Sequence, residues 1–102
     1  MAEPVFDYDP AESLETPEAI AVFVSEALET GDRSFIAYAL GVAARAKGMS
    51  QLARDTGLSR SALYEAFSEE GNPTLETILT LLKHLGIDLS ARPHVEPGPA
   101  KA

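Results

Sequence analysis

The chain has 102 residues, of which 45% are hydrophobic and 24% are charged. These values indicate one soluble globular domain with a core of modest size. The sequence has no cysteine, which excludes disulfides and thiolate metal sites. Its longest apolar run, residues 19–24, is too short to span a bilayer and does not resemble a signal peptide. We therefore expect a cytoplasmic protein that does not contact a membrane.

The net charge of −8 is unevenly distributed along the chain. Residues 1–32 carry nine acidic side chains and no basic one, whereas residues 33–68 carry five basic against two acidic, a net of +3. Residues 69–102 carry three basic and five acidic side chains. Such asymmetry indicates two different partners, although a solvated acidic face explains the pattern equally well.

Residues 1–15 show no clear period and are interpreted as an acidic N-terminal arm, with Val5, Phe6 and Leu14 as anchors onto the body. Residues 16–86 predict an all-α domain, because apolar residues recur at three- and four-residue spacing. We expect five helices, at about residues 17–30, 33–46, 51–56, 60–67 and 75–85. The residues expected to cap or end them are Thr16, Asp32, Ser59 and Thr74, and Gly31, Gly48, Gly57 and Gly86.

The last of these helices is expected to bury one apolar stripe, formed by Leu75, Ile78, Leu79, Leu82 and Leu85. The alternation that follows, within residues 87–92, predicts either a short strand or an extended tail. Residues 93–102 contain three prolines and one glycine, which predict disorder. His84 and His94 have no partner at ligand spacing and are interpreted as surface histidines, so we expect neither a metal nor a cofactor.

Residues 50–67 have the pattern of two short helices that cross steeply around a tight turn. Each position has a packing reason. Ala53 is small where the helices approach, Gly57 supplies a positive φ, and Leu58 fills the space beneath the turn. Ser59 caps the next helix, and the inward-facing residues are Leu52, Leu63 and Phe67. Together these features predict a helix-turn-helix motif.

The second helix of such a motif enters the major groove of DNA, with its N-terminal residues at the base edges. The candidate DNA-binding residues are Gln51, Ser59, Arg60, Ser61, Tyr64 and Glu65. Arg60 suits a guanine, unless it instead pairs with Glu65 or Asp55. Glu65 either accepts a hydrogen bond from cytosine or orients Arg60. Phosphate-binding loops and nucleophile motifs are absent, so we expect no enzymatic activity.

The segments 44–51, 58–63 and 71–73 and the leucine-rich helix before Gly86 resemble the lambda-repressor-type (Xre-like) helix-turn-helix domain. A fuller pattern resembles the addiction-module antidote proteins, a HigA-like antitoxin family, over about residues 6–90. It comprises Tyr8-Asp9, Leu14-Glu15-Thr16, Ala-Arg-Ala-Lys-Gly-Met at 44–49, Gly-Leu-Ser-Arg at 57–60, Leu63-Tyr64 and Glu-Gly-Asn-Pro at 70–73. Ser61 and Phe67 depart from that pattern, in which glutamate and leucine are common.

The resemblance implies an antitoxin of a type II toxin-antitoxin module. Such a protein neutralises a RelE/ParE-like toxin and represses its own operon as a homodimer on palindromic double-stranded DNA. The alternatives are a stand-alone regulator of phage-repressor type and an interaction module that no longer binds DNA. Toxin binding is expected of the acidic arm and first helix, since a toxin that handles RNA is basic, or of residues 87–91 through a sheet edge.

Overall fold

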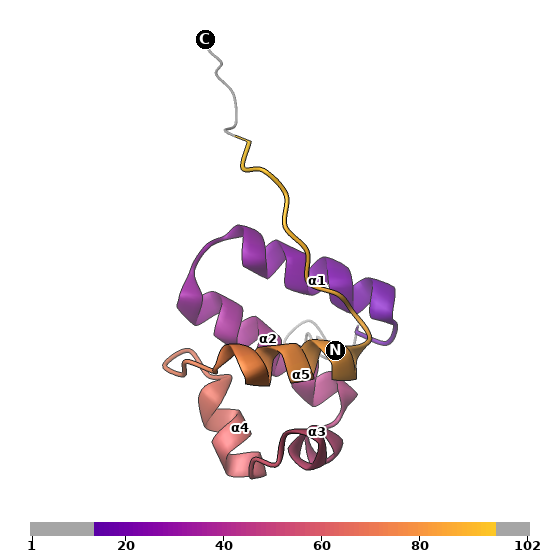
Figure 1. Cartoon of the computed structure of the whole chain (residues 1–102), viewed down its shortest axis with the longest axis vertical. Coiled ribbons are helices and arrows are strands. Elements are labelled where there is room, and N and C mark those ends of the chain that lie inside the picture. Colours follow the sequence, from indigo (N-terminus) through magenta and orange to yellow (C-terminus); the bar gives the residue numbers. More distant parts are fainter. Residues whose placement is uncertain (1–13, 96–102) are drawn as a thin grey trace, which may run out of the picture.

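The computed structural model describes residues 14–95, and within this range the chain forms five α-helices and no strand. The helices are α1 (Pro17–Glu29), α2 (Arg33–Lys47), α3 (Met49–Thr56), α4 (Arg60–Ala66) and α5 (Leu75–Leu85). The predicted all-helical class is thus confirmed. In Figure 1, α1 lies at one end of the molecule, α3 and α4 lie at the other, and α2 and α5 lie between.

Side-chain caps begin four of the five helices at the residues that the sequence predicts. Thr16 Oγ1 accepts a hydrogen bond from the Ala19 amide at 3.1 Å, in front of Pro17 at the first helical position. Asp32, Ser59 and Thr74 accept from the first turns of α2, α4 and α5 in the same way. Each cap satisfies an amide that the helix leaves without a partner, so the helix starts are determined locally.

All five helices contribute to one core. The largest fully buried side chains are Ile20 of α1, Val42 of α2, Leu52 of α3, Leu63 of α4, and Leu81 and Leu85 of α5. Leu14 is also buried in this core, as expected of an anchor, although it lies in front of the predicted domain start at residue 16. Residues 1–13 of the predicted arm and residues 96–102 of the predicted tail lie outside the described residues.

Helix α2 passes very close to the end of α4. Gly41 is buried, and a Cβ atom built on it would collide with the carbonyl oxygen of Phe67, the residue that ends α4. The same atom would lie 3.2 Å from the Cβ atom of Phe67. A side chain at position 41 would therefore hold α4 away from α2, which explains a glycine in the middle of a helix.

In the C-terminal part the expected stripe of α5 is partly wrong, and for residues 87–92 the structure shows the extended tail rather than the strand. Leu75 and Leu79 are 65% and 48% exposed, and the core takes Leu81 in their place. Leucines occur on more than one face of α5, so spacing alone allows two stripes, and only the neighbouring helices decide between them. Residues 87–92 form no strand, because the described chain offers no strand for them to pair with. They run back along α1 as an irregular, largely exposed segment (Figure 1).

Candidate nucleic-acid interface

The link between α3 and α4 is a three-residue turn, residues 57–59, that Gly57 makes possible. Gly57 has φ 78° and ψ 3°, in the left-handed region, and its amide donates to the Ala53 carbonyl at 2.9 Å. This confirms the positive φ predicted for Gly57. Any other residue except asparagine or aspartate would be strained there.

Thr56 holds the same turn through its side chain, a role that the sequence reasoning missed. Its hydroxyl donates to the Leu52 carbonyl at 2.9 Å and accepts from the Leu58 amide at 3.2 Å. Leu58 itself is 39% exposed, so the prediction that it fills the space beneath the turn is wrong. The threonine directly before a helix-ending glycine was the available signal, since its hydroxyl reaches both sides of the turn.

Buried side chains fix how the two helices face each other. Leu52 and Leu63 are completely buried and Phe67 is 4% exposed, as predicted for the inner side of the pair. The opposite side of α4 is therefore exposed, and it carries the remaining candidates. Arg60, Ser61, Tyr64 and Glu65 are all exposed, as is the capping residue Ser59.

Arg60 is left without a partner among residues 14–95. Neither pairing considered from the sequence is present, because no ion pair or hydrogen bond joins Arg60 to Glu65 or Asp55. The Asp55 carboxylate is engaged elsewhere, accepting from Gln51 Nε2 at 3.0 Å and lying 3.2 Å from His84 Nδ1. The guanidinium of Arg60 is consequently available to an external acceptor.

Gln51 is exposed on α3, as a phosphate-contacting residue requires, but it already has two hydrogen bonds. Its side-chain oxygen accepts from Arg54 Nη2 at 2.7 Å, and its nitrogen donates to Asp55. Gln51 therefore orients Arg54, an exposed cation on the same helix that the sequence reasoning did not include. The signal was its position three residues after Gln51, which places both on one helical face.

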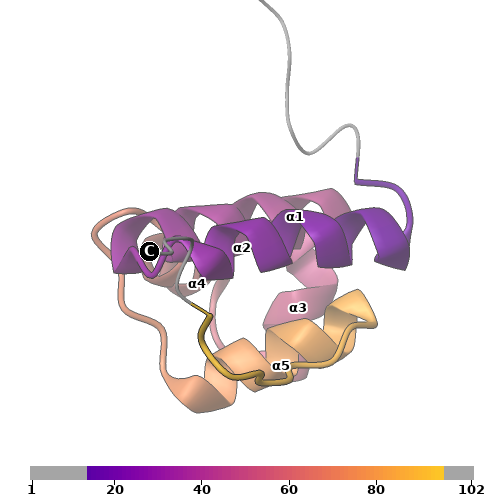
Figure 2. The ribbon, with the colours of Figure 1, turned by 90° about the horizontal axis from the view of Figure 1, so that it is seen from above.

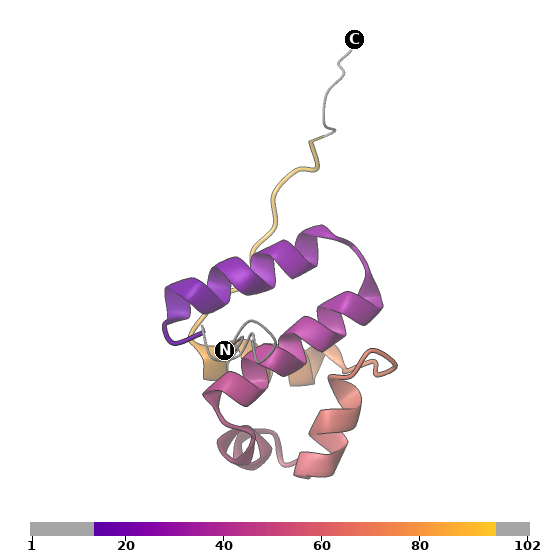
Figure 3. The ribbon, with the colours of Figure 1, turned by 180° about the vertical axis from the view of Figure 1, so that it is seen from behind.

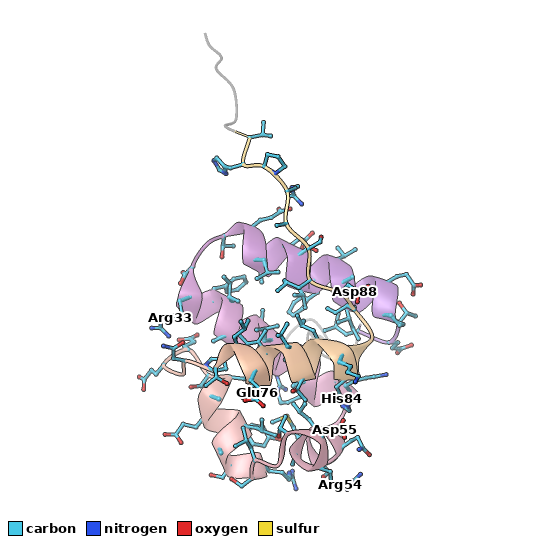
Figure 4. The ribbon with its side chains drawn as sticks, viewed as in Figure 1. Arg33, Arg54, Asp55, Glu76, His84 and Asp88 are labelled. Atoms are coloured by element: carbon cyan, nitrogen blue, oxygen red, sulfur yellow. The ribbon has the colours of Figure 1, made fainter. Side chains whose placement is uncertain are left out.

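His84 is not the surface residue predicted from the sequence. Its side chain is 10% exposed and lies against Asp55, so it connects α5 to α3 (Figure 4). The prediction rested on the lack of a partner at ligand spacing, which carries no information about burial. With Leu81 and Leu85 inside, position 84 falls beside the buried face rather than opposite to it. His84 Nε2 is buried and has no hydrogen-bond partner among the described residues.

The basic centre of the sequence remains largely on the surface. Arg33 is used structurally, because its Nη1 donates to the Gly71 carbonyl at 2.6 Å and so holds the loop between α4 and α5. The other four cations, Arg45, Lys47, Arg54 and Arg60, are exposed. They belong to α2, α3 and α4, the three consecutive helices that lead into and form the candidate interface.

A second surface lies between α1 and the segment after α5. A groove of about 810 Å³ separates α1 residues such as Leu28 from Leu89 and its neighbours. Arg92 of this segment pairs with Glu29 of α1 at 2.9 Å, with both side chains more than half exposed. Because such exposed pairs contribute little to stability, this contact holds the segment only weakly.

Known sequences identify the family of the chain. A protein family described as "Probable addiction module antidote protein" matches residues 4–93. A protein of Haemophilus influenzae, described only as "Uncharacterized protein", is 41% identical over 92 residues, which cover 90% of this chain and 95% of the relative. No solved structure matches the chain. Within residues 14–95 no helix is both long and apolar enough to cross a membrane. The chain belongs to the addiction-module antidote family, whose members are antitoxins rather than enzymes.

Proposed function

We propose that this antidote protein also binds DNA and represses its own operon, with α3 and α4 forming an Xre-like helix-turn-helix of the lambda-repressor type. The observation that carries the proposal is the outer face of α4. It presents Arg60, which has no partner among residues 14–95, and three further exposed polar residues. The glycine turn at Gly57 and the buried inner face hold this helix in place. Recognition helices of this class insert such a face into the major groove.

The exposed residues suit distinct parts of a DNA site. Arg60 can donate two hydrogen bonds to a guanine, the commonest specific contact in the major groove. Ser59, Ser61 and Tyr64 carry hydroxyls that can donate to phosphates, which position the protein without reading sequence. Arg54, oriented by Gln51, would add a phosphate contact. Glu65 can accept a hydrogen bond from a cytosine amino group, and it makes no contact with Arg60 in this structure by which it would orient that side chain.

A helix pair of this size contacts only a few base pairs, so we propose a homodimer on a palindromic operator. The net charge of −8 opposes DNA binding as a whole. The local excess of cations over residues 33–68 offsets it where the DNA would lie, since surface charges more than about 10 Å away are largely screened at 0.1 M salt. Both DNA and toxin would be met in the cytoplasm.

For the toxin that an antidote implies, we propose a small basic protein of RelE/ParE type. The exposed acidic residues of α1, Glu18, Glu26 and Glu29, extend the run of acidic side chains in residues 1–32. Opposite charge would steer a basic toxin to this end of the molecule, away from α3 and α4 (Figure 1). Residues 87–91 are the second candidate, because an extended segment can add to the edge of a toxin sheet.

DNA titration tests the repressor function. The full chain is titrated against its own promoter palindrome and a shuffled duplex of equal length, at several salt concentrations. A preference for the palindrome, weakening linearly with log salt concentration, is expected of a protein that releases counterions from phosphates. Negligible affinity for both duplexes would show that the protein is an antitoxin that does not bind DNA.

A pull-down with the product of the neighbouring gene tests the toxin surface. One shortened chain begins at Leu14, because Leu14 belongs to the core, and another ends at Gly86. Loss of binding only in the first assigns the toxin contact to the arm, and loss only in the second assigns it to the segment after α5. Binding by both shortened chains as strong as by the full chain contradicts both assignments and leaves the glutamates of α1, which both chains keep.

A further inference from the structure

His84 is a largely buried histidine whose place in the fold is not explained by packing alone. It lies in the last turn of α5, and its side chain is 10% exposed. Its Nδ1 atom lies 3.2 Å from the Asp55 carboxylate of α3, whereas Nε2 is buried without a hydrogen-bond partner among residues 14–95. A buried polar atom without a partner lowers stability, and a leucine of similar size would avoid that cost. What the imidazole provides and a leucine could not is the contact with Asp55.

We propose that His84 is a positioning residue for contact with the DNA backbone. It holds Asp55, and Asp55 in turn holds Gln51, so that the guanidinium of Arg54 is presented to a phosphate. The inference rests on the proposed DNA-binding function for its purpose, whereas the contacts themselves are those of the free protein. His84, nine-tenths buried, acts without touching DNA.

The two oxygens of the Asp55 carboxylate have separate partners. Oδ2 faces His84, and Oδ1 accepts a hydrogen bond from Gln51 Nε2 at 3.0 Å. The Asp55 side chain is 40% exposed, so without His84 it could exchange its partners for water and change rotamer. Contact with a largely buried imidazole keeps the carboxylate in one orientation, which leaves Oδ1 directed toward Gln51.

The orientation of the Gln51 amide decides what Arg54 meets. An amide has a donor on one side and an acceptor on the other. Because Gln51 Nε2 donates to Asp55, its oxygen is turned the other way, where it accepts from Arg54 Nη2 at 2.7 Å. A reversed amide would present its NH2 group to the guanidinium, and both groups are donors only. The orientation of Asp55 is thus passed to Arg54 along one face of α3, at three- and four-residue spacing.

The arrangement of the helices lets a buried residue act on an exposed one. Figure 2 shows α3 beside the end of α5 that carries His84, and Figure 3 shows the same two helices from behind. In Figure 4 Asp55 lies next to His84, and Arg54 lies on the side of α3 away from α5. Helix α3 shares its end of the molecule with α4, the proposed recognition helix (Figure 1). A phosphate contact at Arg54 would therefore accompany the base contacts of α4 and fix the position of the protein on the duplex.

Two substitutions of His84 separate positioning from packing. His84→Leu fills the same space without a ring nitrogen, and His84→Asn keeps a donor close to the place of Nδ1. His84→Leu should weaken binding to the promoter palindrome and to a shuffled duplex equally, by about three- to tenfold, because a phosphate contact does not depend on sequence. The slope of log affinity against log salt concentration should fall by up to about 0.9 for each bound copy.

The conservative variant and a matched control complete this comparison. His84→Asn should recover DNA affinity to within about twofold of the parent, because its amide can still reach Asp55. His94→Leu, the same change at the other histidine of the chain, should alter neither the affinity nor its salt dependence. Parent affinity and parent salt dependence in His84→Leu would overturn the proposal.

A double-mutant cycle identifies Arg54 as the group through which His84 acts. In a chain that carries Arg54→Ala, His84→Leu should cause no further loss of DNA affinity, because the contact that it supports is already gone. A purely structural role would instead lower the melting temperature and weaken DNA binding equally in both backgrounds. That outcome would also overturn the proposal.

NMR of the free protein tests the same contacts without DNA. The Arg54 Nε–Hε resonance, assigned by its loss in Arg54→Lys, should report an ordered side chain in the parent and a mobile one in His84→Leu and Gln51→Ala. Gln51→Ala breaks the connection at an exposed residue, so it gives the result even if His84→Leu does not fold. Equal order of Arg54 in the parent and in these variants would overturn the proposal. Should the parent bind neither duplex, the DNA function fails, and the NMR result still decides whether His84 positions Arg54.

Discussion

Replacing Gly41 by alanine should destabilise this protein, contrary to the usual effect of that change in a helix. Gly41 lies in the middle of α2, where alanine normally gains about 0.5–1 kcal/mol over glycine. Here the added Cβ atom would collide with the Phe67 carbonyl oxygen and would also press on the Phe67 Cβ atom at 3.2 Å. A backbone carbonyl cannot rotate away as a flexible side chain can, so α4 would have to move.

Overpacking a closely packed site costs about 1–3 kcal/mol, which exceeds the gain in helix propensity. We expect a net loss of about 1–2 kcal/mol. For a domain of this size, that corresponds to a melting temperature lower by roughly 5–15 °C. The affinity for the operator should fall as well, because the displaced helix is the proposed recognition helix.

Thermal unfolding followed by circular dichroism measures the effect, and Gly57 provides a matched control. A Cβ atom at Gly57 would meet nothing within 4 Å, so strain there arises only from its φ of 78°. Asparagine tolerates that φ better than alanine does, so Gly57→Asn should lose less stability than Gly57→Ala. At Gly41 the order should reverse, because size decides. A higher melting temperature for Gly41→Ala than for the parent would refute the close approach of α2 and α4.

Three further predictions concern single side chains. Gly57→Val should cost more than about 1 kcal/mol of unfolding free energy, because a β-branched residue is strained at positive φ, and an unchanged melting temperature would contradict that role. Arg60→Ala should leave the melting temperature unchanged and weaken operator binding by about 1–3 kcal/mol. An equal loss of affinity for shuffled DNA would show that Arg60 contacts only phosphate. Leu81→Ala should cost about 2–5 kcal/mol in chemical denaturation, because Leu81 is completely buried, and Leu79→Ala should cost much less. Equal losses at the two leucines would show that the assigned face of α5 is wrong.

The link from α3 to α5 bears on how firmly the candidate interface is held. Asp55 is shared by Gln51 of its own helix and His84 of α5. A carboxylate held from two helices keeps the exposed face of α3 in a fixed position relative to the core. The same contacts continue through Gln51 to Arg54, so α5 is joined to the proposed phosphate-binding residue (Figure 4).

The sequence by itself determined where four of the five helices begin, whereas α3 begins at Met49, two residues before the predicted start. Thr16, Asp32, Ser59 and Thr74 cap their helices as predicted, and Gly57 ends α3 with the expected positive φ. These features depend on bonds between residues at most four apart, so they can be read without knowing the fold. For the same reason the outward face of α4 was predicted correctly, since Leu63 and Phe67 leave it only one side to expose.

Tertiary packing alone decided the features that depend on distant residues. The buried face of α5 could not be chosen from a helix with leucines on several faces, so Leu79 was expected in the core, which holds Leu81 instead. The burial of His84 depends on its contact with Asp55 of α3, which spacing along α5 does not reveal. The close approach of Gly41 to Phe67 likewise joins residues far apart in the chain. Local spacing specifies which faces of a helix are apolar, whereas burial depends on which of them another helix covers.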